Sequence, residues 1–200
     1  MKRFLAALGL LALVSACIPT ADYRSSVVHI RADGVCTGFV VNAKHGIIVT
    51  AQHCVGATDK LATVTFFDGS TNTGKFIRED AINDTAVLQL DDVPTKLKEL
   101  PLRCDIPARY GEEITLIGMP ADVFRWYTSW GRVAGFGVAN NSPFTDYKFV
   151  WLNVAGTGGN SGGPVIDSLG RVIAVLTVKL EGGSMLGAVP IQAACKLVLK

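Results

Sequence analysis

The sequence has no marked excess of charge of either sign. It contains 19 basic and 17 acidic residues, and Lys2 and Arg3 account for the difference. Proteins that bind nucleic acid usually carry a strongly basic face, so we expect no nucleic-acid partner. The apolar run from Phe4 to Val14 is too short to span a bilayer, so no transmembrane helix is expected there.

Histidine is scarce, and the three histidines are His29, His45 and His53. His45 lies in a polar stretch that predicts a solvated turn, and His29 alternates with apolar neighbours on a predicted strand. Neither has a cysteine, histidine or carboxylate partner at the spacing of a metal site. We therefore predict no metal site and no cofactor.

Ser161 is the candidate nucleophile because glycines flank it on both sides, within residues 158–164. Glycine lets a substrate approach the backbone closely. A serine hydroxyl needs a base and a carboxylate to become reactive. His53 directly follows an apolar strand pattern and Asp84 directly precedes another, which makes them the candidates for those two roles. Asp80 is a rival to Asp84, but it lies in a charged run before the strand.

The pattern Gly159-x-Ser161-x-Gly163 also fits the nucleophile turn of α/β-hydrolases. In those enzymes the chain order is serine, acid, histidine, whereas every histidine here precedes Ser161. The α/β-hydrolase interpretation is therefore excluded unless the enzyme dispenses with the histidine. The order His53, Asp84, Ser161 is the order of the chymotrypsin-like proteases.

Three segments resemble the signature blocks of trypsin-like serine proteases: Thr50-Ala51-Gln52-His53-Cys54, Asp84-Thr85-Ala86-Val87-Leu88 and Gly159-Asn160-Ser161-Gly162-Gly163-Pro164. Within that family, residues 36–41 and 187–191 look most like the bacterial HtrA/Deg-type protease domain. The resemblance covers about residues 26 to 195. It implies hydrolysis of peptide bonds, with a peptide or unfolded protein as substrate.

The resemblance also implies a role for each site residue. Ser161 would be the nucleophile, His53 the general base and then acid, and Asp84 the group that fixes the imidazole tautomer. The backbone N–H groups of Gly159 and Ser161 would form the oxyanion hole. Digestive members of the family carry an aspartate before the nucleophile, which pairs with a new N-terminus after cleavage. Asn160 cannot make that ion pair, so we expect a protease that is active without such cleavage.

Substrate specificity is also inferred from the resemblance. The residue six before the nucleophile lies at the base of the S1 pocket, and here it is Ala155, with Thr177, Lys179 and Glu181 as candidates for the opposite wall. No acid is present at the base of the pocket to hold a P1 arginine or lysine. The sequence therefore predicts cleavage after small or medium apolar residues.

The N-terminus has the plan of a signal peptide, with residues 1–16 removed on export. Its end, Leu13 to Cys17, resembles a bacterial lipobox, in which Cys17 receives lipid and becomes the first mature residue. An ordinary secretory signal or a plain N-terminal anchor remains the alternative. Ile18 is not the aspartate that resembles an inner-membrane retention signal, which favours the outer membrane. We thus expect a lipid-anchored protein of the bacterial cell envelope, facing the periplasm or the exterior.

Four cysteines remain beyond Cys17, and an even number allows three pairings. An oxidising compartment favours disulfide bonds. The family resemblance implies a bridge from Cys36 to Cys54, which leaves Cys104 and Cys195 as the second pair. Two buried free thiols are the alternative for that second pair.

Short apolar segments separated by Gly, Asn, Asp and Pro predict an all-β chain of two six-stranded antiparallel barrels with a short C-terminal helix. The expected strands are 26–31, 37–42, 46–50, 61–67, 74–79, 85–90, 113–118, 125–138, 148–154, 163–167, 171–178 and 184–189. The expected layout is a tether at 17–25, a protease domain at 26–200, barrel one at 26–90, a connector at 91–105 and barrel two at 106–200. The active site would lie between the barrels.

Trp126, Tyr127 and Trp130 form an aromatic cluster that we expect to pack on barrel two, with a membrane-interface or substrate-binding loop as the alternative. Together these patterns predict an exported, lipid-anchored serine endopeptidase. The alternative is a catalytically silent lipoprotein of the same fold that binds a peptide or protein partner. Esterase activity would be incidental to the same triad, and no pattern specifies an oligomeric state.

Overall fold

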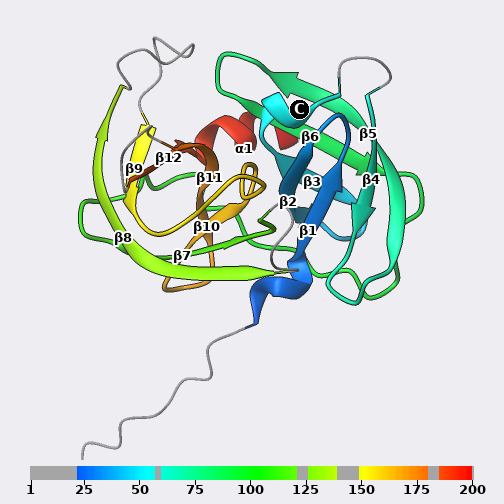
Figure 1. The fold of residues 1–200 in the computed structure, drawn as a ribbon, viewed down its shortest axis with the longest axis horizontal. Helices are drawn as coiled ribbons and strands as arrows, with labels where there is room; N and C mark the ends of the chain where they lie inside the picture. The colour runs from blue at the N-terminus through cyan, green and yellow to red at the C-terminus, as the bar shows by residue number, and fades with distance from the viewer. Residues whose placement is uncertain (1–21, 57–59, 121–125, 139–148, 180–184, 200) are drawn as a thin grey trace, which may run out of the picture.

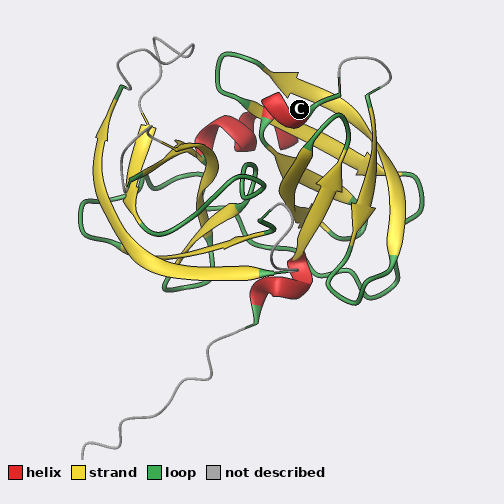
Figure 2. Ribbon diagram, in the orientation of Figure 1, coloured by secondary structure: helices red, strands yellow, loops and turns green. Residues whose placement is uncertain are grey.

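The computed structural model describes residues 22–56, 60–120, 126–138, 149–179 and 185–199. Figure 2 shows that strands dominate and that helices are few and short. The elements are η1 (Tyr23–Ser26), β1 (Val27–Arg31), β2 (Val35–Asn42), β3 (Ile47–Thr50), η2 (Gln52–Cys54), β4 (Leu61–Thr65), β5 (Thr71–Asp80), β6 (Thr85–Leu90), β7 (Glu113–Gly118), β8 (Tyr127–Gly137), β9 (Phe149–Asn153), β10 (Pro164–Asp167), β11 (Val172–Lys179), β12 (Leu186–Pro190) and α1 (Gln192–Val198). Within the described residues no helix is long and apolar enough to cross a membrane.

The strands form two closed antiparallel barrels that stand side by side (Figure 1). Barrel one has the strand order β1-β2-β3-β6-β5-β4, and barrel two has the order β10-β11-β12-β9-β8-β7. Closure leaves no unpaired sheet edge in either barrel. The predicted fold, two six-stranded barrels followed by a short helix, is confirmed.

Strands that face both their own barrel and its partner are buried on both sides. Val40 and Ile48 point into the core of barrel one, whereas their neighbours Phe39 and Val49 join a third cluster between the barrels. Because successive side chains on a strand alternate faces, such strands read as unbroken apolar runs. This shared cluster fixes one barrel against the other.

The connector between the barrels runs from Asp91 to Glu112, longer than the predicted 91–105 segment. It is hydrogen-bonded to both sides, through Leu100 N–H to the Val40 carbonyl at 2.9 Å and Arg103 N–H to the Val172 carbonyl at 3.0 Å. A disulfide from Cys104 to Cys195 ties it to α1. Figure 1 shows α1 at the seam of the two barrels, so this disulfide joins the connector to a helix that lies between them.

A buried ion-pair network anchors the same connector. Arg103 is 4 % exposed and bonds the carboxylates of Glu112 and Asp167, and Asp167 also accepts two side-chain bonds from Arg171. Hydrogen bonding to Arg103 lowers the pKa of Glu112. Burial raises the pKa of Asp167, but the bonds from Arg171 and the Leu169 N–H outweigh it, so the net shift is downward. Both carboxylates are therefore charged in the folded protein near neutral pH.

Replacing Arg103 with methionine is expected to lower the free energy of unfolding by about 3 to 5 kcal/mol at neutral pH, because it removes one partner of a buried ion pair. The lowered pKa values of Glu112 and Asp167 stabilise the fold above about pH 4.5, and this contribution is lost as the pH falls through the folded-state values. The parent should therefore lose stability on acidification more steeply than Arg103→Met. Urea unfolding across that range measures both, and equal pH slopes would contradict the assignment.

Several expectations differ from the structure in detail. Residues 23–26, placed largely in the tether, form η1, and His53 lies in the 3₁₀-helix η2 rather than at the strand end itself. Trp126 packs at the seam between the barrels, where its Nε1 donates to the Val27 carbonyl at 3.3 Å. The expectation that the aromatic cluster packs on barrel two is wrong for Trp130, which is 73 % exposed. The signal peptide, Cys17 and Glu181 lie outside the described residues.

Candidate active site

A tight turn between β5 and β6 presents Asp84 to the interior. Asp80 accepts hydrogen bonds from the backbone and the side chain of Asn83, which holds the turn closed. Asp84 follows with φ +43°, a left-handed conformation that aspartate tolerates better than most residues, and its side chain is buried. Asp80 therefore bonds within its own turn, whereas Asp84 is the acid that contacts His53.

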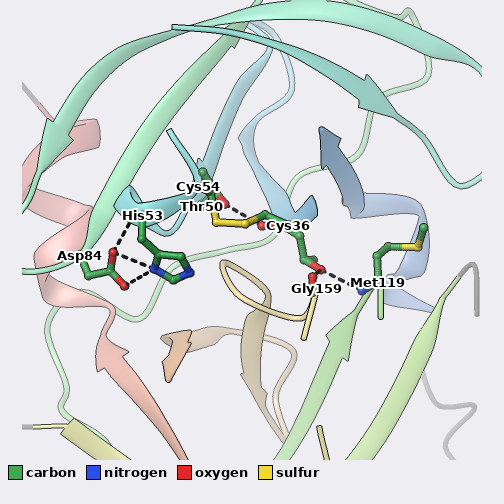
Figure 3. The surroundings of a disulfide bond; sticks show 8 residues. Cys36, Thr50, His53, Cys54, Asp84, Met119 and Gly159 are labelled. Atoms are coloured by element: carbon green, nitrogen blue, oxygen red, sulfur yellow. Dashed lines mark hydrogen bonds and ion pairs between the residues drawn. A yellow bond between two sulfur atoms is a disulfide. The ribbon is translucent and has the colours of Figure 1, made fainter. Parts of the chain in front are cut away.

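His53 is held by Asp84 through two separate groups. The backbone N–H of His53 donates to Asp84 Oδ1 at 2.9 Å, and its Nδ1 lies 2.9 Å from Asp84 Oδ2 (Figure 3). A carboxylate can only accept, so Nδ1 carries the proton and the lone pair is left on Nε2. The ring is 41 % exposed while the carboxylate is buried. The pair therefore offers an oriented base to an incoming substrate.

The Cys36–Cys54 disulfide lies beside the imidazole, on the side away from Asp84 (Figure 3). A ring nitrogen of His53 and the two sulfur atoms all lie within 4.8 Å of one another. This cluster has the composition of a metal site, but both sulfurs are bonded to each other and cannot act as thiolate ligands. Among the described residues it is the only such cluster, so its role here is to brace η2 against β2.

Ser161 lies in a loop of residues 157–163, called here the nucleophile loop, between β9 and β10. The loop is pinned to β11 by two bonds, Gly162 N–H to the Leu176 carbonyl at 2.7 Å and Leu176 N–H to the Gly163 carbonyl at 2.9 Å. Gly162 has φ +82°, and a Cβ there would overlap Thr50 Oγ1 and the Thr37 carbonyl oxygen. Only glycine can therefore follow the nucleophile at this close approach to barrel one.

The backbone N–H groups of Gly159 and Ser161 are the donors expected for the oxyanion hole. Within the described part of the chain, neither Gly159 nor Ser161 donates its N–H to a backbone carbonyl. Gly159 adopts φ +91°, which again favours glycine. Gly159 is buried and Ser161 is partly exposed.

The loop reaches the histidine through a short series of links. The Ser161 carbonyl accepts from Thr37 N–H at 2.8 Å, Thr37 follows Cys36, and the bridge leads from Cys36 to Cys54, the neighbour of His53. These links connect the loop that carries Ser161 to the segment that carries His53 across the barrel seam. No local pattern in the sequence identifies Thr37, because its partners lie in the other barrel.

Two of the expected specificity residues differ in their surroundings. Ala155 is exposed, immediately before the nucleophile loop. Thr177 lies on β11, is buried, and donates a long hydrogen bond of 3.4 Å to the Val175 carbonyl. Their shared role in an S1 pocket stays a prediction.

The chain is similar in sequence to known serine proteases. Residues 36–175 match a family model described as a trypsin-like peptidase domain. The chain is 29 % identical over 170 residues to a probable periplasmic serine protease do/HhoA-like of Haemophilus influenzae, with 82 % of this chain and 36 % of the relative covered. It is also 29 % identical over 154 residues to the serine protease Do-like HtrA of Bacillus subtilis, with 72 % and 33 % covered. The chain spans about a third of the length of these curated relatives.

A solved structure gives the same fold. The crystal structure of the serine endoprotease from Yersinia pestis matches with a TM-score of 0.72 at 21 % identity, covering 88 % of this chain and 62 % of that one. At this identity the likeness concerns the fold alone. It agrees with the two barrels described above.

Proposed function

Because the chain belongs to the trypsin-like peptidase family, we propose that it is a serine endopeptidase whose catalytic triad is Ser161, His53 and Asp84. The observation that carries the proposal is the doubly bonded His53–Asp84 pair, with Nδ1 and the backbone N–H of one residue on the same buried carboxylate. The ring of His53 is 41 % exposed, whereas the carboxylate that holds it is buried. This arrangement fits a base that must face a substrate.

The proposed chemistry uses only groups of this chain. His53 Nε2 removes the proton of Ser161 Oγ as that oxygen attacks the substrate carbonyl carbon. The N–H groups of Gly159 and Ser161 bind the oxyanion of the tetrahedral intermediate. The imidazolium then gives its proton to the leaving amine, and water hydrolyses the resulting acyl-enzyme by the same steps in reverse order. Asp84 stabilises the transient positive charge on His53 throughout.

A fluorophosphonate probe tests this proposal directly, because it labels only an activated serine. We expect the full chain with Cys17→Ser to be labelled stoichiometrically, with the adduct mapped to Ser161 by mass spectrometry, and to cleave unfolded casein. A folded, disulfide-intact protein that is neither labelled nor active would instead favour the silent binding protein.

Cleavage is expected after small or medium apolar P1 residues, because Ala155 places no carboxylate at the proposed base of the S1 pocket. Digestion of a peptide library followed by sequencing of the products measures this preference. Ala155→Asp should shift cleavage toward P1 arginine and lysine, since a carboxylate at the proposed base of the pocket would form charge-assisted hydrogen bonds with a cationic side chain. A parent that already prefers basic P1 residues would contradict the proposed pocket.

We further propose that Cys17 carries lipid and anchors the protease in the cell envelope, with the outer membrane as the favoured site. The support is the lipobox-like segment before Cys17, together with a relative named as a periplasmic protease. Membrane fractions from cells expressing the parent and Cys17→Ser separate the possibilities. Release of the variant into the soluble envelope fraction is expected, and equal release of both would point to an ordinary secretory signal.

A further inference from the structure

The side chain of Asn160 does not hold the nucleophile loop in place. It is fully buried, yet within the described residues neither its Oδ1 nor its Nδ2 has a hydrogen-bond partner. Gly118 makes room for the amide, because a Cβ there would overlap it. The side chain at position 160 therefore makes no ion pair that could order the nucleophile loop. Another residue has to hold the loop in place.

Thr37 of β2 makes the bonds that Asn160 does not. It is fully buried, and its Oγ1 donates to the Gly159 carbonyl at 2.8 Å while accepting from Met119 N–H, also at 2.8 Å. Its backbone N–H donates to the Ser161 carbonyl at 2.8 Å. One residue of barrel one thus bonds two residues of the nucleophile loop and the end of β7 in barrel two. Figure 3 shows Gly159 and Met119 approaching the Cys36 side of the site.

The Gly159 carbonyl, which accepts from Thr37, belongs to the central peptide of the proposed oxyanion hole. The peptide between Gly159 and Asn160 joins the two peptides that carry the proposed oxyanion donors, the N–H groups of Gly159 and Ser161. Holding its carbonyl toward Thr37 sets the dihedral angles on both sides. The Asn160 N–H then faces the Thr157 carbonyl at 3.2 Å, inside the loop, rather than the substrate.

We propose that Thr37 is a positioning residue for catalysis, whose hydroxyl locks the nucleophile loop of barrel two to the histidine-bearing barrel one. This inference rests on the proposed function. On this proposal the Thr37 hydroxyl of barrel one, and not the side chain of Asn160, holds the oxyanion-hole peptides in place. The Cys36–Cys54 disulfide links the residue before Thr37 to the residue after His53, and so connects β2 to η2.

Two substitutions separate the hydroxyl from the shape of the side chain. Thr37→Val keeps the volume but leaves the Gly159 carbonyl and the Met119 N–H buried without a partner, so the loop must move to satisfy them. Thr37→Ser keeps the hydroxyl and loses only a methyl group. Misplacement of a site by about 1 Å can cost about 10²-fold in rate, and loss of one oxyanion donor costs about 10²- to 10³-fold.

The experiment compares these variants in the full chain with Cys17→Ser, using an ester or peptide substrate and the fluorophosphonate probe. We expect Thr37→Val to lower both kcat and the labelling rate by about 10²-fold with KM changed by less than about threefold. Thr37→Ser should stay within about threefold of the parent. The pH at which kcat/KM is half-maximal should not move, because the His53–Asp84 pair is untouched.

Loss of stability alone must be distinguished from loss of positioning. Glu112→Gln weakens the connector ion pair away from the loop and is expected to lower the thermal midpoint while keeping kcat within about threefold of the parent. If Thr37→Val shows no cooperative unfolding transition, Thr37→Ala takes its place with the same expected loss.

Three results would overturn the proposal. The first is a folded Thr37→Val with parental kcat, and the second is a Thr37→Ser as impaired as the valine variant. The third is a Glu112→Gln variant that loses kcat in proportion to stability. An unlabelled parent would instead refute the proposed function, so the two failures are told apart before any variant is compared.

Discussion

Ser161→Ala is expected to lower kcat by about 10⁶-fold while leaving the fold intact. The hydroxyl is the group that forms the acyl-enzyme, and alanine offers no replacement. What Ser161 contributes to structure is its backbone, through the bond from Thr37 N–H to its carbonyl, and that bond survives the change. Residual turnover would come from the oxyanion hole and substrate binding alone.

Casein cleavage, fluorophosphonate labelling and urea unfolding together measure this result. Ser168→Ala is the matched control, because Ser168 is an exposed serine in the turn between β10 and β11 and lies outside the nucleophile loop. It should behave as the parent in all three assays. If Ser161→Ala kept more than about a hundredth of the parental rate, another nucleophile would be responsible for hydrolysis.

The positions of the strands could be predicted from the sequence because each one is a local pattern. The run 46–50 is bounded by Gly46 and ends before the histidine, and the observed strand Ile47–Thr50 differs from it by one residue at its start. The predicted pairing of Cys36 with Cys54 and of Cys104 with Cys195 also agrees with the bridges in the structure. It rested on a family resemblance that included the bridge beside the histidine.

Features that depend on contacts between barrels could not be predicted in the same way. Thr37 appears in the sequence as one polar residue in an apolar strand, and its partners Gly159 and Met119 lie about a hundred residues away. Trp126 and Trp130 have similar local contexts, yet one is at the seam and the other is in solvent. Which face of a strand meets the second barrel is a property of the closed fold, and no residue spacing encodes it.

The choice between the two acidic residues shows the same limit at the site itself. The charged run before β6 makes Asp80 the less suitable candidate in sequence, but only the turn geometry separates the roles. Asp80 bonds Asn83 and so shapes the turn that carries Asp84 to His53. An acid that orders the backbone and an acid that holds a histidine therefore stand four residues apart, the first partly exposed and the second buried.

Asp84→Asn is expected to lower kcat by about 10⁴-fold with little change in KM or stability. Asparagine is isosteric and tolerates the φ of +43° at this position, so the turn should persist. Its amide N–H₂ would face Nδ1 of His53, which then becomes the acceptor and leaves the proton on Nε2. In that tautomer the imidazole cannot take the proton of Ser161.

Steady-state kinetics of Asp84→Asn and Asp80→Asn, each compared with the parent, test this account. Asp80→Asn removes the charge of the rival acid but keeps an oxygen that can accept from the Asn83 N–H, so it should stay within about tenfold of parental kcat. A fluorophosphonate labelling rate that falls with kcat in Asp84→Asn would place the defect in the first proton transfer, before the acyl-enzyme forms. Parental rates for Asp84→Asn, or an equal loss in Asp80→Asn, would require a different partner for His53. Because the carboxylate is buried and the ring is exposed, the expected outcome separates a base held for catalysis from an ion pair that only stabilises the fold.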